Sequence, residues 1–331
     1  MAIKALWAVS MLAVGTMGAL GTAQAQSDPV KYPTRPVTLV VPAGPGGATD
    51  VVARVMAEQL QKRLGQAVVV DNKTGASGML GAQAVARAAP DGHTLLLSYS
   101  TPVFYTHHTV AKVPYNIEKD FAFITQVAGT SLTVMVNGSI PVNNMKEFMA
   151  WAEANKGKIS YGSYAAGSPG HLMSAYLSDS RKLGMQHVAY KSEAPFLQDL
   201  AAGVVPWGMG TLAAGQALIK SGKIRPIAVL GPNRLKDLPN VPTMAEQGFK
   251  DSEFHTVAWF TLLAPAATPK PILDKLEKES VEIIHSAPMK ARFQVLGLDS
   301  VKGGSEQFRA DFKRVDPLIA KLVKISGYKP E

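Results

Sequence analysis

The stretch VVPAGPGGATD, residues 40–50, decides how the chain begins to fold. It ends an apolar run, residues 37–41, that predicts a buried strand. A loop of glycine, proline and alanine follows, and helical periodicity then runs from about Thr49 to Gly65. A glycine-rich turn between a strand and a helix presents backbone N–H groups and the positive end of a helix dipole. This turn therefore favours an anionic ligand.

The alternation of strand and helix continues along the chain. Strands expected at 67–71 and 94–98 flank a helix at 79–89, and this order predicts an α/β fold with a parallel, doubly wound sheet. Two crossings divide the chain into a first domain, residues 30–127 plus 231–331, and a second domain, residues 128–230. We further expect strands at 121–127, 132–136, 159–162, 186–190, 204–209, 224–230 and 256–263, and helices at 145–154, 169–182, 271–285 and 305–325.

A second stretch, KISYGSYAAGSPGHL at residues 158–172, repeats the opening pattern. A strand gives way to small residues, after which Ser168 suits an N-cap and Pro169 suits the first helical position. Two such units, one in each domain, would hold a carboxylate from both sides of a cleft. The alternative is that both loops are ordinary turns in which glycine permits close packing, and local sequence weighs the two equally.

The first 25 residues have the pattern of a secretory signal peptide. Lys4 precedes an apolar stretch at 5–20, and AQA at 23–25 is a small-x-small cleavage site. We expect cleavage after Ala25 and a periplasmic mature protein. A membrane anchor is disfavoured because the run is short and interrupted by glycine. The chain has no cysteine, so it offers neither a lipid acceptor nor a disulfide.

The charge of the chain is basic but spread thinly. Its 34 Lys and Arg against 25 Asp and Glu give a formal net charge of +9, without a run of five like charges. This distribution favours a solvated basic surface over a nucleic-acid site, and we expect no nucleic-acid partner. A positive field would still attract anionic ligands.

Catalytic motifs are missing from the sequence. It contains no Gly-x-Ser-x-Gly elbow, no phosphate loop and no His-Glu-x-x-His pattern, so we expect no enzyme activity, no cofactor and no metal. His107 and His108 are interpreted as a surface pair in preference to a pair of metal ligands. His171, in the first turn of the second loop's helix, either faces a ligand or packs the loop. Trp207 and Trp259 are expected in the core, with an apolar wall for a flat ligand as the alternative.

Several long runs, together and in order, resemble the Bug-type, TctC-like substrate-binding proteins of tripartite tricarboxylate transporters. They are PTRPVTLVVPAGPGGATDVVARVMAEQL, VVVDNKTGASGMLGAQAVARAAPDGHTLLLS, the stretch at 158–172 and GKIRPIAVLGPNRLKDLPNVPTMAEQGF. The resemblance implies a two-domain Venus-flytrap fold, type II-like, with two crossover strands. It also implies capture of a small carboxylate in the interdomain cleft, for uptake by integral membrane transporter subunits. We expect a monomer.

The resemblance further implies which segments contact the ligand: the two loops, the turn at 74–78, the strand end at 98–100 and the region of Tyr190. The expected ligand-binding residues are Ala43, Gly44, Gly46, Gly47, Asp50, Ser77, Ser98, Ser163, Ala166, Gly167, Ser168, His171, Tyr190 and Thr211. Gly46 and Gly47 are interpreted as positions where the backbone must approach the carboxylate closely.

Two departures from the family pattern bear on the ligand. Ala43 stands where a phenylalanine is common, which leaves more room in the first loop. Gly210 and Thr211 stand where relatives that bind amino acids carry an aspartate that pairs with the ligand ammonium. Since no carboxylate is evident there, we hypothesise that the ligand lacks an ammonium group at that point. Tight binding of aspartate or glutamate in calorimetry would contradict this hypothesis.

Two other functions fit the same sequence features. A periplasmic sensor would present its closed form to a receptor kinase, and it would use the same two-domain clamp as a transport protein. A secreted hydrolase would need a nucleophile–base pair that the sequence does not reveal. Uptake and gene expression after deletion would separate transport from sensing, and turnover of esters or amides would reveal a hydrolase.

Overall fold

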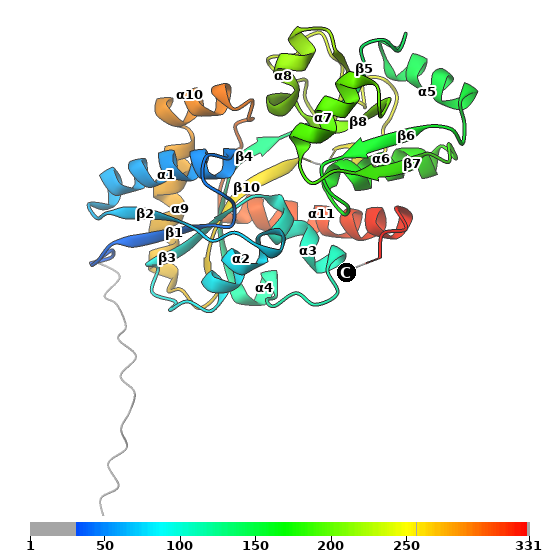
Figure 1. Cartoon of the computed structure of the whole chain (residues 1–331). Coiled ribbons are helices and arrows are strands. Elements are labelled where there is room, and N and C mark those ends of the chain that lie inside the picture. The colour runs from blue at the N-terminus through cyan, green and yellow to red at the C-terminus, as the bar shows by residue number, and fades with distance from the viewer. Residues whose placement is uncertain (1–30, 256, 330–331) are drawn as a thin grey trace, which may run out of the picture.

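The computed structural model describes residues 31–255 and 257–329 and consists of two α/β domains, each built on a five-stranded sheet (Figure 1). The expected signal peptide, residues 1–25, lies outside the described residues. Among the described helices, none combines the length and the apolar character that crossing a bilayer requires.

The first sheet is mixed, in the order β2-β1-β3-β10-β4. The expected parallel arrangement holds for β2, β1 and β3, but β10 pairs antiparallel with both β3 and β4. The reason is the chain path: β4 leads toward the second domain, and β10 brings the chain back in the opposite direction. The strands are β1 (Val37–Val41), β2 (Val68–Asn72), β3 (Thr94–Ser98), β4 (Phe121–Thr130) and β10 (Ala258–Pro265).

The second sheet, in the order β7-β6-β8-β5-β9, is mixed as well. β6 pairs parallel with β7 and β8, whereas β5 pairs antiparallel with β8 and β9. The expected strand at 204–209 begins later, at Trp207. The strands are β5 (Leu132–Asn137), β6 (Ser160–Ser163), β7 (Gln186–Ala189), β8 (Trp207–Thr211) and β9 (Ile224–Val229).

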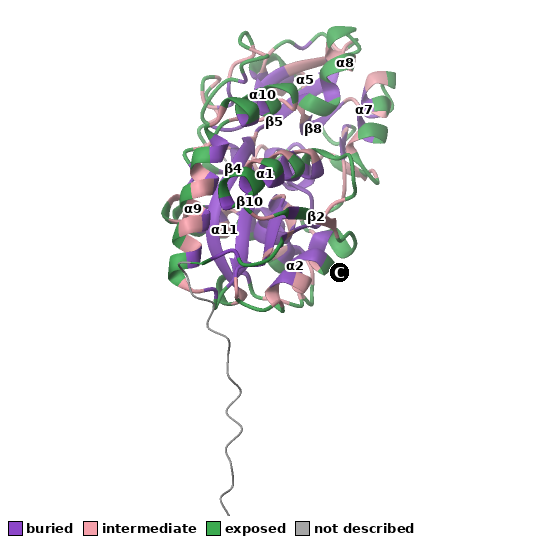
Figure 2. Cartoon of the chain, turned by 90° about the vertical axis from the view of Figure 1, so that its left-hand side faces the viewer, coloured by how far each residue is buried: buried purple, intermediate pink, exposed green. Residues whose placement is uncertain are grey.

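Helices cover both faces of both sheets, because each strand alternates its apolar side chains between the faces. In β1, Val37, Leu39 and Val41 join the cluster under α1, α9 and α10, and Val40 points to the opposite cluster. Figure 2 shows the buried strands between helices whose outer faces are exposed. The helices are α1 (Ala48–Leu64), α2 (Met79–Ala86), α5 (Met145–Ala154), α6 (Pro169–Ser180), α7 (Glu193–Ala202), α8 (Leu212–Lys220), α9 (Lys270–Ile284), α10 (Ala287–Val295) and α11 (Ser305–Ile325).

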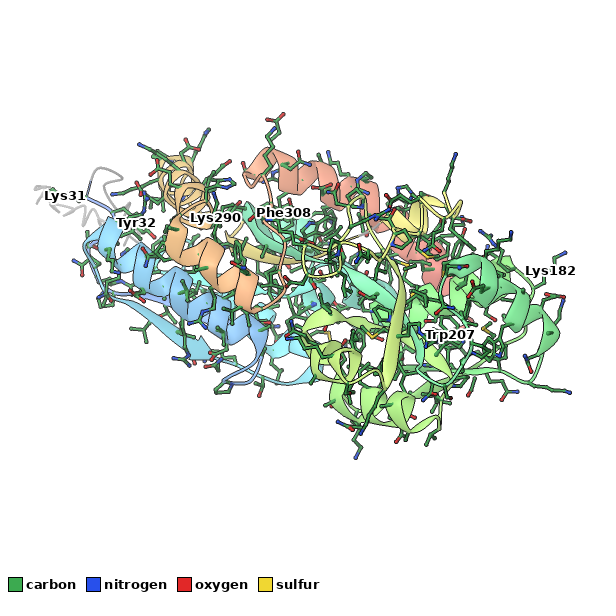
Figure 3. The ribbon with its side chains drawn as sticks, turned by 90° about the horizontal axis from the view of Figure 1, so that it is seen from above. Lys31, Tyr32, Lys182, Trp207, Lys290 and Phe308 are labelled. Atoms are coloured by element: carbon green, nitrogen blue, oxygen red, sulfur yellow. The ribbon has the colours of Figure 1, made fainter. Side chains whose placement is uncertain are left out.

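Two glycines in the second sheet are required by close packing. The ring of Phe196 on α7 lies against the sheet, and a Cβ on Gly162 or Gly208 would come within 2.4 or 2.6 Å of it. Any larger residue would displace Phe196 from a fully buried position. Trp207 lies inside the same domain and is 0% exposed, while Lys182 stands at its far edge (Figure 3).

Several short elements were not expected from the sequence. They are η1 (Ala76–Gly78), the π-helical turn η2 (Thr101–Tyr105), α3 (Thr106–Thr109), α4 (Ile117–Asp120) and η3 (Ser252–His255). α10 was missed too, since it buries only Met289 and Phe293 and so shows no continuous apolar stripe. Helical periodicity cannot be recognised over four or five residues.

The C-terminal helix α11 joins the two domains. Phe308 stacks on Phe123 of β4 at 4.5 Å, and Phe312 lies 5.5 Å from Phe104. Further along, α11 packs against α6 of the second domain, and Lys321 forms an ion pair with the buried Glu253. One apolar cluster therefore runs through both domains.

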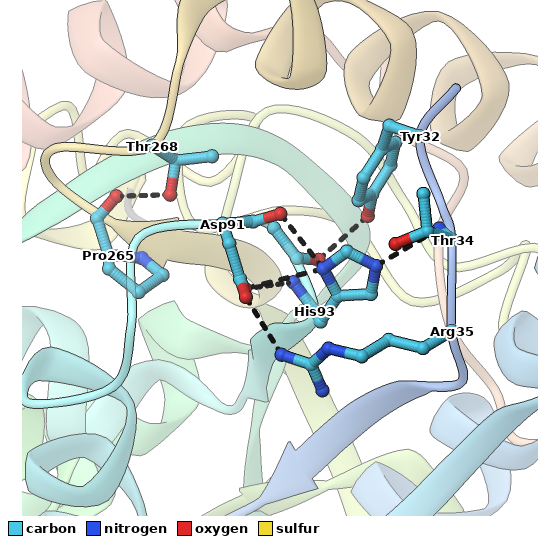
Figure 4. Close-up of polar contacts among 8 residues, drawn as sticks. Tyr32, Thr34, Arg35, Asp91, His93, Pro265 and Thr268 are labelled. Atoms are coloured by element: carbon cyan, nitrogen blue, oxygen red, sulfur yellow. Dashed lines mark hydrogen bonds and ion pairs between the residues drawn. The ribbon is translucent and has the colours of Figure 1, made fainter. Parts of the chain in front are cut away.

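The start of the described chain is held by hydrogen bonds at the end of the first sheet where β1 and β3 begin (Figure 4). The Tyr32 hydroxyl donates to the carbonyl of Gly92 at 2.7 Å, and the Thr34 N–H donates to Nε2 of the buried His93 at 3.3 Å. Asp91 accepts from the His93 N–H at 3.0 Å and from Arg35 at 2.8 Å. His93 therefore has a structural role here.

Removing the aromatic contact of α11 should destabilise the protein strongly. Phe308→Ala leaves a cavity beside Phe104 and Phe123, at a cost of about 3–5 kcal/mol in the free energy of unfolding. Leu80→Ala, at a side chain that is 52% exposed, is the control and should cost less than about 0.5 kcal/mol. Urea unfolding measures both, and equal midpoints for the two variants would contradict the role given to α11.

Candidate functional site

A cavity of about 360 Å³ lies between the two domains. The second domain contributes the loop between β6 and α6, and the first contributes η1, the end of β3 and part of β10. Its lining residues are Ser77, Tyr99, Ser100, Thr101, Thr109, Val110, Thr130, Tyr164, Ala165, Ala166, Gly167, Ser168, Pro169, Ala258, Trp259, Phe260 and Tyr328.

The first-domain wall is set by backbone contacts of Trp259. Its N–H donates to the Ser100 hydroxyl oxygen at 2.7 Å, and the same hydroxyl donates to the Trp259 carbonyl at 3.1 Å. The indole lies 5.3 Å from the ring of Phe104. Trp259 is thus both a core residue and a wall of the cavity, whereas Trp207 lies wholly in the core and does not line the cavity.

The second-domain wall is held in shape by its own side chains. The Ser168 hydroxyl oxygen caps α6 by accepting from the N–H of His171. The same hydroxyl donates to the carbonyl of Ala165 at 2.7 Å. The Gly167 N–H donates to Nδ1 of His171 at 3.0 Å, and the Gly170 N–H donates to the hydroxyl of Tyr164 at 3.3 Å. These contacts fix the loop before any ligand arrives.

Two backbone N–H groups of this loop have no hydrogen-bond acceptor among the described residues and are available to a ligand. No described residue accepts from the N–H groups of Ala165 and Ala166, although both residues line the cavity. Ser163 does not reach it: the hydroxyl is fully buried, 2.9 Å from the Ala165 carbonyl and 2.7 Å from Nε2 of His187. Ser163 therefore stabilises the conformation of the loop and does not contact the cavity.

His171 packs the loop instead of lining the cavity. It is 5% exposed and stacks on His187 with ring centroids 3.7 Å apart. Burial lowers the pKa of His171 to about 4, and burial together with the neighbouring His171 lowers the pKa of His187 to about 4. Both rings are therefore neutral at physiological pH, and for His171 the hydrogen bond that its Nδ1 accepts from the Gly167 N–H requires this.

The first loop stands apart from this cavity. Ala43, Gly44, Gly46, Gly47 and Asp50 are not among its lining residues. The Asp50 carboxylate is buried and accepts from the N–H of Gly46 at 2.8 Å, besides Arg54 and Asn72 at 2.9 Å each. Although burial opposes it, these hydrogen bonds hold the pKa of Asp50 below its usual value. The loop thus already holds one carboxylate, its own.

The two glycines of the first loop differ in backbone conformation. Gly46 has φ +82°, which favours glycine. Gly47, the N-cap of α1, has φ −73°, and an added Cβ would meet only the Gly44 oxygen, at 3.6 Å. The backbone itself therefore requires glycine at Gly46 and not at Gly47.

Three further expected residues lie away from the cavity. The Ser98 hydroxyl is fully buried and donates to the Tyr99 carbonyl, and the Tyr190 hydroxyl donates to Asp199 at 2.8 Å. Thr211 caps α8 and is hydrogen-bonded through its N–H and its hydroxyl to the carboxylate of Glu193. Of all the residues expected to contact ligand, the cavity brings together Ser77, Ala166, Gly167 and Ser168.

The position of Glu193 contradicts the expectation that no carboxylate lies at Gly210 and Thr211. A carboxylate does stand at Gly210 and Thr211, since a Cβ on Gly210 would lie 2.9 Å from Oε1 of Glu193. Burial raises the pKa of this carboxyl, against the hydrogen bonds from Thr211 that lower it. Only the fold reveals it, because Glu193 begins α7 and is 18 residues away from Thr211 in sequence.

A larger hollow, about 720 Å³, opens between α10 and the region of Leu235 to Asp237. Charges of both signs line it, among them Lys236, Lys290 and Asp299. It touches neither glycine-rich loop and contains no residue expected to bind ligand. The smaller cavity therefore remains the candidate site.

The neutral histidines should make the stability of the fold pH-dependent. The unfolded chain has histidine pKa values near about 6.5. As the pH falls from this value to about 4, the unfolded state binds protons at these two histidines that the folded state does not bind, so their contribution to stability decreases; above this range their contribution is constant. His171→Asn should flatten the profile of melting temperature against pH, and His285→Asn, on the surface, should not. Parallel profiles for wild type and His171→Asn would contradict this origin.

Comparison with known proteins assigns the family. Residues 52–323 match the family model TctC, described as the tripartite tricarboxylate transporter family receptor. The chain is 33% identical to Protein BugT of Bordetella pertussis over 299 residues, which cover 90% of this chain and 91% of BugT. It is 34% identical to a UPF0065 protein of Cupriavidus necator, over 91% of this chain and 90% of that protein.

Solved structures agree with this assignment. Rpa4515 of R. palustris with adipate superposes with a TM-score of 0.77 at 31% identity, covering 91% of this chain and all of that one. The periplasmic binding protein BugD gives 0.74 at 33% identity, with the same coverage. MatC from Rhodopseudomonas palustris with bound malate gives 0.72 at 27% identity, over 88% of this chain and 100% of that one. The family consists of binding proteins for transport and not of enzymes. The chain belongs to the TctC, or Bug, family of periplasmic solute-binding proteins.

Proposed function

We propose that this protein captures a small carboxylate between its two domains and delivers it to the membrane subunits of a tripartite tricarboxylate transporter. The observation that carries the proposal is the interdomain cavity, lined by the loop between β6 and α6. Two structurally similar family members hold adipate and malate, which are both carboxylates.

The cavity offers uncharged donors to a carboxylate. None of the described residues that line it is Asp, Glu, Lys, Arg or His; instead they provide hydroxyls, as in Ser77 and Thr130, and the N–H groups of Ala165 and Ala166. Hydrogen bonds from neutral groups at the end of a helix are sufficient to hold an anion. Tyr99, Trp259 and Phe260 supply an aromatic surface, so the proposed ligand combines one carboxylate with an apolar or flat body.

Closure would bring the first loop to the ligand. The helix that follows this loop, α1, has an exposed Gly47 as its N-cap. No described residue accepts from the N–H groups of Gly47 and Ala48. The two domains lie side by side, with this end of α1 directed toward the second domain (Figure 1). A ligand that bonds both loops binds the closed arrangement more tightly, and it therefore shifts the population toward closure.

The proposal includes the form in which the protein acts. Signal peptidase would remove residues 1–25 after Ala25, and the mature chain would work as a periplasmic monomer. The moving units would be residues 30–127 with 231–331 and residues 128–230. The first of these proposed boundaries falls within β4, and the second falls just after the end of β9.

A thermal-shift screen tests ligand capture most directly. Dicarboxylates such as adipate and malate, keto acids, aromatic acids and the matching amides are each titrated against the purified mature protein. A carboxylate that binds the folded state raises the melting temperature progressively with concentration. A screen in which the amides stabilise and the acids do not would overturn the carboxylate assignment.

Delivery to a transporter is tested in cells. Deleting the gene should abolish uptake of the radiolabelled carboxylate identified in the screen, and the uptake should return with a plasmid copy. Unchanged uptake together with altered expression of neighbouring genes would instead support the sensor.

A negative charge at Ala166 should abolish capture. Ala166 is exposed and lines the cavity, so Ala166→Asp places a carboxylate where the ligand carboxylate is proposed to bind. We expect its affinity to fall by about tenfold or more, which is ~1.4 kcal/mol or more. Ala166→Asn, of equal size and without charge, is the matched control and should retain most of the affinity. Equal affinities in calorimetry would contradict the proposed position of the carboxylate.

Blocking the first loop should also abolish ligand-induced stabilisation. Gly47→Val keeps an allowed φ and has space for its Cβ, so the fold should persist while the side chain obstructs the approach of a ligand to α1. Ala202→Val, at an exposed residue of α7, serves as control. If Gly47→Val retains the full thermal shift, the first loop is structural only.

A further inference from the structure

A cluster of three side chains lies outside the proposed binding cavity, between α3 and α11. Nε2 of His107 is 2.5 Å from Oδ1 of Asp316, and Nε2 of His108 is 2.8 Å from the same oxygen. The potential metal-binding atoms of the three residues all lie within 4.8 Å of one another. Across residues 31–255 and 257–329, no other set of His and acidic side chains brings three such atoms so close.

The convergence of His107 and His108 is unusual for neighbours in sequence. Successive side chains on an α-helix point about 100° apart and do not face one another. Here α3 has only four residues and continues from the π-helical turn η2, and the two imidazole rings lie 4.1 Å apart. Both rings therefore reach one carboxylate on α11 from the same short segment.

We propose that His107, His108 and Asp316 form a binding site for one divalent transition metal ion of the zinc type, which joins α3 to α11. Two imidazole nitrogens and one carboxylate oxygen are a ligand set that suits zinc, with a fourth position left for water. The two nitrogens make the site a poor one for magnesium or calcium, which prefer oxygen ligands.

The present geometry is close to what the metal needs. Bond lengths of about 2.0–2.1 Å place the atoms of a tetrahedral site roughly 3.3 Å apart, so each contact to Asp316 must open by less than about 1 Å. The side chains of His107, His108 and Asp316 are 29%, 19% and 35% exposed, which leaves them room to move and gives an ion access from solvent.

Without metal, hydrogen bonds join the same atoms. The carboxylate of Asp316 can accept hydrogen bonds from both rings, and these bonds hold α3 against α11 in the structure described here. A metal ion would take the place of the hydrogen between each Nε2 and the Asp316 oxygen, and each neutral ring would then carry its proton on Nδ1. Because protons compete with the metal for these atoms, binding should weaken as the pH falls, more steeply than adsorption on one histidine.

The site adjoins the interdomain cavity. Thr109, the residue after His108, lines the cavity, and a Cβ on Gly167 of the second domain would lie 3.4 Å from its side chain. A metal held by His107, His108 and Asp316 would thus stiffen the first-domain segment that meets the second loop. The inference does not depend on the identity of the captured ligand.

Titration of the tag-free mature protein with zinc tests the site. Calorimetry should show one ion per chain, and cobalt in its place should give the intense visible absorption of a tetrahedral site. Asp316→Asn and His108→Ala should each weaken zinc binding by about tenfold or more. His285→Ala removes an exposed histidine outside this cluster, whose Nε2 lies 3.1 Å from the Lys302 carbonyl oxygen, and it should leave the affinity unchanged.

The shift in melting temperature that zinc causes can be compared between variants even if a variant is itself less stable. Zinc should raise the melting temperature of the wild type and of His285→Ala, and it should not raise that of Asp316→Asn, which keeps the shape of the side chain. Wild-type binding no tighter than that of Asp316→Asn, or of the double variant His107→Ala/His108→Ala, would overturn the proposal.

Discussion

The contact between Trp259 and Ser100 is the constraint on which the architecture of the site depends. It fixes the returning strand β10 against the end of β3 through two hydrogen bonds to the backbone of Trp259. The strand that re-enters the first domain thereby forms a wall of the interdomain cavity. The domain connection and the candidate ligand site thus share one piece of structure, and a change in the angle between the domains must alter the cavity.

The C-terminal helix adds a second connection of a different kind. α11 anchors its aromatic side chains in the first domain and packs on α6 in the second, so one continuous apolar cluster spans both. Rotation of one domain against the other must keep these contacts or slide along them, because a packed core tolerates little expansion. Motion is therefore easiest on the side of the molecule that faces away from α11.

Local sequence predicted the regular elements well and the site only in part. The apolar run of β1 and the glycine after α1 are short-range signals, and both were placed correctly to within a residue. The cavity, in contrast, gathers Ser77, Thr130 and Tyr328 from segments that no local pattern relates. The carboxylate of Glu193 at Thr211 was missed for the same reason, since it depends on how α7 packs beside β8.

His171 and Asp50 show a further limit of pattern reading. Each stands at the start of a helix, where a polar side chain indicates contact with a ligand or with the loop itself. The structure shows contact with the loop: His171 accepts from Gly167, and Asp50 accepts from Gly46. The sequence could not separate the two possibilities, because the same residue types at the same spacing serve both.

The carboxylate of Asp50 accepts a hydrogen bond from its own loop, and this contact limits how the first loop can bind an anion. One backbone donor, the N–H of Gly46, is already occupied, and the buried negative charge beside it would repel a second carboxylate. Arg54, hydrogen-bonded to Asp50 at 2.9 Å, offsets that charge from the solvent side. An incoming carboxylate is therefore left with the donors at Gly47 and Ala48, at the outermost turn of α1. In the proposed mechanism, these two donors would complete a site that begins with the second loop, and a carboxylate bonded to both loops would favour closure.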